Sequence, residues 1–97
     1  MLSAIVLLTT ERERTSDVAE ALAETGGVSE VYSVAGRYDL AAVVRASDSD
    51  ELAAIVTERI RRVPGIVTSE TLIAFRVYAR SDVEAGFAIG MDETRRP

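Results

Sequence analysis

The 97-residue sequence contains no cysteine, histidine, tryptophan or lysine, and all eleven of its basic residues are arginines. Without cysteine or histidine there is no thiolate nucleophile, no imidazole base and no Cys/His metal site. Without lysine the chain cannot form a Schiff base, and without cysteine it has no disulfide framework. These absences exclude most catalytic chemistry, so we expect a protein that is not an enzyme and holds no cofactor or metal.

Positive net charge and long apolar runs are also missing. The formal charge is −5, which argues against direct binding of nucleic acid, because a polyanion would be repelled. The arginines at 59, 61 and 62 are interpreted as complementing the dipole at the end of a helix rather than as a phosphate site. The apolar start, residues 1–8, is too short to cross a bilayer and lacks the features of an export signal. We therefore expect a cytoplasmic protein without a membrane partner, and its arginine-rich composition is typical of a GC-rich bacterial genome.

The remaining composition is that of one small folded domain. Hydrophobic residues make up 47% of the chain, so disorder is not expected. A chain of this length buries only about 60–65% of its unfolded surface, and oligomerisation is a common way to complete such a core.

The hydropathy pattern predicts four strands and two helices in the order βαββαβ. Asp17 with Glu20 is predicted to cap the first helix, which stops at Gly26-Gly27. The second helix is predicted to start with Asp48 as cap and Glu51 three residues later, and to end at Pro64-Gly65. The strands are expected at residues 2–9, 28–35, 38–46 and 66–77.

This order describes an α+β, ferredoxin-like split βαβ fold, with a four-stranded antiparallel sheet and both helices on one face. A tight connection at Gly36-Arg37 should join the second and third strands as a hairpin. The third and fourth strands are apolar at successive positions, whereas a solvated sheet face would alternate with polar residues. We therefore expect a homodimer whose two sheets face each other, as in a dimeric α/β barrel.

The chain divides into a domain over residues 1–79 and an extension over residues 80–97. Val83, Ala85, Phe87 and Ile89 alternate in this extension, which is expected to pack on the domain or on a neighbouring subunit. Its last residues, from Thr94, are expected to fray.

Two clusters of polar residues are candidate sites. Asp48-Ser49-Asp50-Glu51 resembles the start of a calcium loop, but Ala53 and Arg59 occupy the positions of its required glycine and bidentate glutamate, so a metal site is rejected. Gly36-Arg37-Tyr38-Asp39 offers turn N–H groups, an aromatic wall and a carboxylate, a combination that suits a zwitterion. The alternative is that Gly36 serves the turn, Tyr38 packs and Asp39 satisfies backbone groups.

Residues 28–39, ending in that Gly-Arg-Tyr-Asp loop, resemble the ligand-binding (RAM) domain of the Lrp/AsnC, or feast/famine, transcription regulators. Val63-Pro64-Gly65-Ile66 and Ser69-Glu70-Thr71 are similar to the turn and strand start that follow in that family. The resemblance covers residues 2–78. It implies the fold given above, a face-to-face dimer, and assembly of dimers into rings, commonly octamers.

The resemblance also implies a small effector, usually an amino acid, and a set of residues that bind it. The family's loop falls on Gly36, Tyr38 and Asp39, with Arg37 between them, and its hydroxyl pair falls on Ser69 and Thr71. Arg37 stands where an acidic or polar residue is frequent, and Ser69 replaces a threonine but keeps the hydroxyl. Family regulators carry a helix-turn-helix before this domain, whereas this sequence starts at the first strand, so we expect a member without its own DNA-binding domain.

Several functions follow from this comparison. The first is a non-enzymatic module that senses an amino acid and oligomerises within a transcription-regulatory system. The second is a structural partner that assembles with a full-length Lrp/AsnC regulator and binds no ligand. An ACT-type amino-acid-binding domain shares the strand order, and small dimeric monooxygenases share the fold, but no residue set in this sequence supports an enzyme.

Overall fold

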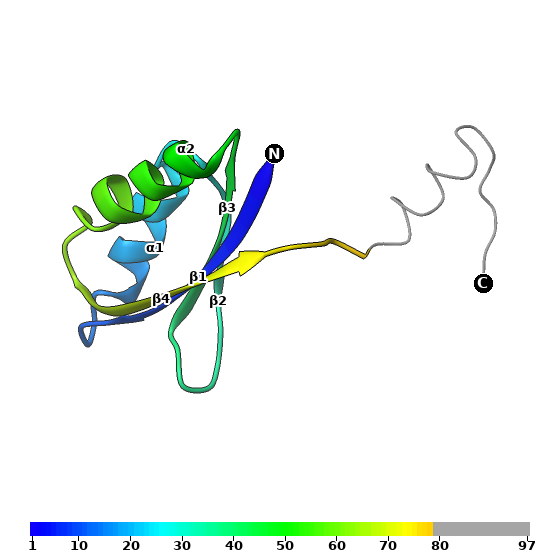
Figure 1. The fold of residues 1–97 in the computed structure, drawn as a ribbon. Helices are drawn as coiled ribbons and strands as arrows, with labels where there is room; N and C mark the ends of the chain where they lie inside the picture. The colour runs from blue at the N-terminus through cyan, green and yellow to red at the C-terminus, as the bar shows by residue number, and fades with distance from the viewer. Residues whose placement is uncertain (79–97) are drawn as a thin grey trace.

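The structure is a computed structural model that describes residues 1–78. It confirms the α+β fold with two helical segments and a four-stranded antiparallel sheet in βαββαβ order (Figure 1). The expected extension over residues 80–97 lies outside the described residues. The elements are β1 (Leu2–Thr10), α1 (Thr15–Ala23), β2 (Val28–Ser33), β3 (Leu40–Ala46), α2 (Ser49–Ala54), its π-helical continuation η1 (Ile55–Ile60), and β4 (Ile66–Ala74).

The strand order in the sheet is β2-β3-β1-β4, so β1 and β3 are central and β2 and β4 are edges. All three pairings are antiparallel, and Ile5 of β1 lies opposite Val43 of β3 and Leu72 of β4. The predicted β2–β3 hairpin is thus present. Both helices lie on one side of the sheet, and the other side has no covering layer in the described chain (Figure 1).

The core lies between the helices and the two central strands. Because side chains alternate along a strand, the even-numbered residues from Ala4 to Leu8 and from Leu40 to Ala46 all point toward the helices and are buried. The buried helical residues that meet them are Val18, Leu22, Leu52, Ile55 and Ile60. Gly27, before β2, has φ +98°, and a Cβ there would lie 2.3 Å from Ile55 Cδ1. Both the backbone and the core therefore require glycine at this position.

The two helix starts differ from each other. The predicted cap of α2 is confirmed, because Asp48 Oδ1 accepts a hydrogen bond from the Glu51 N–H at 2.8 Å. Glu51 in turn accepts from the N–H and hydroxyl of Ser47, which lowers the pKa of its carboxyl group. The predicted cap of α1 is wrong. That helix starts two residues before Asp17, after a turn in which Arg14 N–H donates to Glu11 C=O at 3.0 Å.

Four strand limits also differ from the prediction, the first being β1, which ends at Thr10 rather than residue 9. β2 ends at Ser33 rather than residue 35, and β3 starts at Leu40 rather than residue 38, so a six-residue loop replaces the tight connection. β4 ends at Ala74 rather than residue 77. The reason is the register: Ala74 lies opposite Ser3, near the start of β1, so the residues beyond it have no strand beside them.

The face of the sheet away from the helices, here called the open face, carries several apolar side chains. Ile5 is 41% exposed and Leu72 opposite it is 45% exposed, while Leu7 and Val43 are half-buried. Exposed apolar surface of this kind marks interaction sites in folded proteins. That a second chain covers this face stays a prediction.

Candidate ligand-binding site

The loop between β2 and β3, residues 34–39, contains four of the six residues predicted to form the site. The loop is closed by a hydrogen bond from Val34 N–H to Asp39 C=O at 3.0 Å. Asp39 N–H donates to Leu8 C=O at 2.8 Å, which fixes the loop to the end of β1. Gly36 has φ +132°, in the region that favours glycine, with no atom within 4 Å of an added Cβ. The loop conformation, not crowding, requires glycine here.

The Asp39 carboxylate is held by the backbone of β1. Its Oδ2 accepts from Thr10 N–H at 2.8 Å and lies 3.5 Å from the Thr10 hydroxyl, which in turn lies 2.6 Å from the hydroxyl of Thr15 at the start of α1. Among the described residues, Oδ1 of Asp39 has no hydrogen-bond partner. Asp39 therefore accepts a hydrogen bond from a backbone N–H, as expected if its role is structural. Its second carboxylate oxygen is still available to another donor.

Tyr38 reaches β4, where its hydroxyl donates a hydrogen bond to Glu70 Oε1. This bond raises the pKa of Tyr38, because it is made by the phenolic proton and is lost with it. Desolvation and the negative charge of Glu70 raise the pKa further, and the nearby Arg37 opposes the rise only in part. Glu70 was not predicted as a site residue. The sequence did hold a signal for it. Glu70 lies between Ser69 and Thr71, and because side chains alternate along a strand, it points to the face opposite to those two residues.

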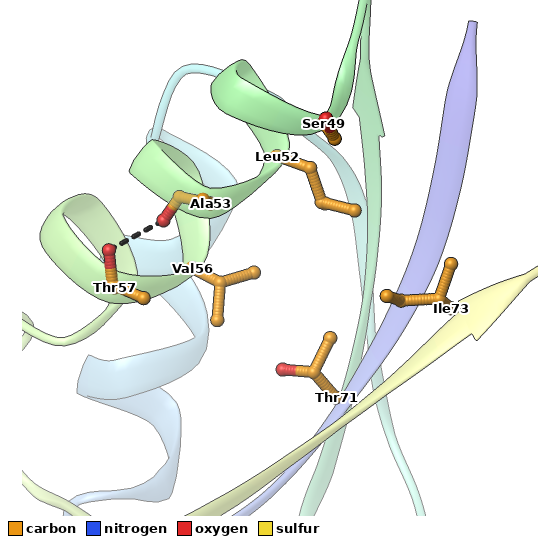
Figure 2. Close-up of a pocket in the computed structure, with 7 residues that line it drawn as sticks. All are labelled: Ser49, Leu52, Ala53, Val56, Thr57, Thr71 and Ile73. Carbon is orange, nitrogen blue, oxygen red and sulfur yellow. Dashed lines mark hydrogen bonds between the residues drawn. The ribbon is translucent and has the colours of Figure 1, made fainter.

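Ser69 and Thr71 belong to the helix side of the sheet. Their partners in register, Leu8 and Val6, are buried beneath the helices. Thr71 lines an apolar cavity of about 240 Å³ between β4 and the α2–η1 helix, together with Leu52, Val56 and Ile73 (Figure 2). Ser69 lines a second cavity of about 230 Å³ that also includes Arg61.

The six predicted site residues therefore do not converge within one chain. Gly36, Arg37 and Asp39 form the loop cluster, and Tyr38 joins it to Glu70 on the open face. The hydroxyl pair lies on the other face, and β1 separates Ser69 from Leu40, which follows Asp39. The loop cluster offers both a guanidinium and a carboxylate, the groups that a zwitterionic ligand requires.

Other kinds of site find no support in residues 1–78. No group of three or more acidic side chains is placed to hold a metal ion in this part of the chain. Among the same residues, no helix is long and apolar enough to cross a membrane. Arg59, from the basic cluster, donates to Gly26 C=O at 2.9 Å and so ties the helix end to the loop before β2.

Comparisons with known proteins identify the class of this domain. The family model described as "Lrp/AsnC ligand binding domain" matches residues 3–83, most of the chain. The chain therefore belongs to the Lrp/AsnC ligand-binding domain family, a family of transcription regulators. This confirms the resemblance seen in the sequence.

Individual relatives agree with the family. An uncharacterized HTH-type transcriptional regulator of Pyrococcus horikoshii is 41% identical over 59 residues, which are 61% of this chain and 39% of that protein. The chain thus spans well under half the length of this curated relative. The crystal structure of TTHA0845 from Thermus thermophilus is 46% identical with a TM-score of 0.76, covering 82% of this chain and 100% of that one. A regulator of Neisseria meningitidis, NMB0573, crystallised with L-Met, has a TM-score of 0.69 at 12% identity, over 77% of this chain and 50% of that one, and shows the fold alone.

Proposed function

We propose that this domain senses a small zwitterionic molecule, of the amino-acid class, through the loop at residues 36–39. The observation that carries the proposal is the state of the Asp39 carboxylate. One oxygen is fixed by the Thr10 N–H, and the other faces no partner in residues 1–78. A carboxylate positioned in this way can accept hydrogen bonds from an ammonium group without the cost of ordering it first.

The same loop offers groups for the other end of a zwitterion. The Arg37 guanidinium is exposed beside Tyr38, and a guanidinium binds a carboxylate through two parallel hydrogen bonds. Tyr38, held against Glu70, forms a wall. The Neisseria regulator, part of which has the same fold, was solved in complex with L-Met, a molecule of this class. Sensing of this kind needs no catalytic group, so the proposed role is not enzymatic.

Assembly is the second part of the proposal. The open face, which carries Ile5 and Leu72, covers the same face of a second copy, and the dimers associate further into rings, such as octamers. Ser69, remote from the loop cluster in one chain, contributes to the effector site where two dimers meet, whereas Thr71 lines the apolar groove beside β4. A monomeric mass in sedimentation at micromolar concentration would contradict this part.

A direct test uses the full chain and each of the twenty amino acids at millimolar concentration, with thermal unfolding as the readout. A ligand present at about one hundred times its Kd stabilises the folded state by roughly 2.7 kcal/mol, which raises Tm by about ten degrees or more in a domain of this size. We expect a rise with one or a few amino acids only.

The variant that isolates the charge is Asp39→Asn, because its amide oxygen can still accept from Thr10 N–H. Asp48→Asn is the matched control, since it removes one charge from a helix cap and also keeps an acceptor. We expect Asp39→Asn to lose the rise in Tm and Asp48→Asn to keep it. Equal ligand responses in both variants would exclude Asp39 from binding.

The alternative function is a structural partner of a full-length Lrp/AsnC regulator, without a ligand. The contact between Asp39 and Thr10 favours it, because that contact gives the carboxylate a purely structural task. No thermal response to any amino acid, together with mixed oligomers in native mass spectrometry with such a regulator, would establish this alternative.

A further inference from the structure

The outer edge of β4 is a free sheet edge in the described chain. β4 pairs with β1 on one side only, and its other side faces no strand of residues 1–78. Ile73, which points to the helix side, is 55% exposed. A free edge with apolar side chains presents unpaired N–H and C=O groups that another strand can bind.

An apolar groove runs along this edge. It is the cavity of about 240 Å³ between β4 and the α2–η1 helix, with Leu52 and Val56 on the helix and Thr71 and Ile73 on the strand (Figure 2). The lining is almost entirely apolar, so the groove favours hydrophobic side chains over a charged ligand.

The residues that directly follow β4 are mostly apolar and exposed. Residues 75–78 run beyond the end of the sheet in the direction of β4 (Figure 1). Phe75 is 96% exposed, and Val77 and Tyr78 are also exposed. A strand beside this segment would cover them.

The sequence that follows has the pattern of such a strand. Val83, Ala85, Phe87 and Ile89 alternate with polar or small residues. The family model ends at residue 83, and 82% of this chain already accounts for the whole Thermus protein. Most of this segment thus lies beyond the family domain.

We propose that residues 83–89 return along β4 of the same chain as a fifth, antiparallel strand, with the alternating apolar residues on the helix side. A five-residue loop at 78–82 is within the usual length of hairpin loops and contains Arg80, Ser81 and Asp82. In this register Val77 lies opposite Val83, and Ile73 lies opposite Phe87. The aromatic ring then fills the groove beside Leu52 and Val56.

Charge supports this register over its neighbours. Counting back from the Val77–Val83 pair places Arg76 opposite Glu84, and directly opposed residues of unlike charge stabilise an antiparallel pair. A shift by one residue would instead place Phe87 on the open face and Glu84 opposite Val77. The groove is therefore a docking site for the chain's own C-terminal segment.

The absence of cysteine makes this register directly testable in the full chain. The variant Phe75→Cys with Ala85→Cys joins two residues that the proposal places opposite each other, and it keeps Phe87. Opposed Cβ atoms in antiparallel strands lie about 4.5–5.5 Å apart, close to the distance of about 3.5–4.5 Å in a disulfide. The matched control is Phe75→Cys with Gly86→Cys, whose second side chain would point to the other face.

We expect mild oxidation to form a disulfide within single chains for the first pair and not for the control, as read by mass under denaturing conditions. A disulfide that joins two chains would show that a second copy fills the edge, and no disulfide would show that the edge stays open. Either result would overturn the proposal, as would equal reaction of both pairs.

Amide hydrogen exchange tests whether the segment also seals the groove. In the unmodified chain, the outward amides of β4 should be protected, and Phe87→Ser should remove this protection while Ala88→Ser keeps it. Fast exchange of these amides in the unmodified chain would overturn the proposal. Both experiments are independent of any effector, so failure of ligand binding does not affect them.

Discussion

β3 and β4 lie on either side of the same central strand, yet they differ almost completely in burial. Every second residue of β3, from Leu40 to Ala46, is buried, whereas no residue of β4 is fully buried. This difference cannot be predicted from the two strand sequences, because both contain apolar residues at successive positions. β3 lies between two strands beneath the helices, and β4 is an edge.

An apolar run in a strand marks surface that must be covered, and the topology decides which part of the protein covers it. For β3 the cover is the helix layer. For β4 it is proposed to be a second copy on the open face and the chain's own C-terminal segment along the edge. The two faces of β4 can therefore be separated by experiment.

The largest expected effect comes from truncating one leucine on each side of this comparison. Leu8 is fully buried, so Leu8→Ala should lower the free energy of unfolding by about 2–5 kcal/mol at any protein concentration. Leu72, on the open face, should stabilise the dimer rather than the single chain. Leu72→Ala should therefore weaken the dependence of the unfolding midpoint on protein concentration. Urea unfolding over a hundredfold range of protein concentration measures both the free energy of unfolding and the concentration dependence of the midpoint.

An unfolding midpoint that does not change with protein concentration in the unmodified chain would contradict this prediction. The open face would then not be a subunit interface, and Leu72→Ala would be expected to cost far less than Leu8→Ala.

Much of the fold could be predicted from the sequence because local patterns agree with tertiary structure there. The spacing of Leu52, Ile55 and Ile60, and the cap at Asp48, correctly predicted a helical segment that starts after Asp48, although its second half, η1, is π-helical and it ends at Ile60 rather than at Pro64-Gly65. The start of α1 could not be predicted in the same way. No side chain caps this helix, and the residues before it are held by the Thr10–Thr15 hydroxyl contact and by a hydrogen bond from Glu11 N–H to Gly65 C=O, a partner remote in the sequence.

The candidate site shows the same limit. The loop residues 36–39 are adjacent in sequence, so their proximity was predictable. The Tyr38–Glu70 hydrogen bond joins residues 32 positions apart, and it depends on the register of β4. The orientation of Ser69 and Thr71 away from the loop also follows from that register, which no motif in the sequence specifies.

A second prediction compares a glycine in the core layer with one in the loop. Gly27→Ala would place a Cβ 2.3 Å from Ile55 Cδ1 and strain a residue at φ +98°, so it should destabilise the domain by about 2–4 kcal/mol. Gly36→Ala meets no atom within 4 Å and pays only for its backbone conformation, about 1–2 kcal/mol. Thermal and urea unfolding of the two variants should preserve this order. A larger loss in Gly36→Ala would indicate that the loop is packed against another subunit.

The smallest expected effect is the pH dependence of the link between the loop and β4. The pKa of Tyr38 is raised above its ordinary value of 10.0 by its hydrogen bond to Glu70, so the folded state holds this proton more tightly than the unfolded state. The resulting stability is fully present below pH 10.0 and is lost as the pH rises through the raised pKa. Absorption titration of phenolate should show one tyrosine whose pKa falls back in Glu70→Gln, which keeps an acceptor but removes the charge. Tyr32 is the internal reference, because its raised pKa depends on Glu30 and should not respond to Glu70→Gln. If both tyrosines shift together, the effect of the substitution is general and the loop is not specifically tied to β4.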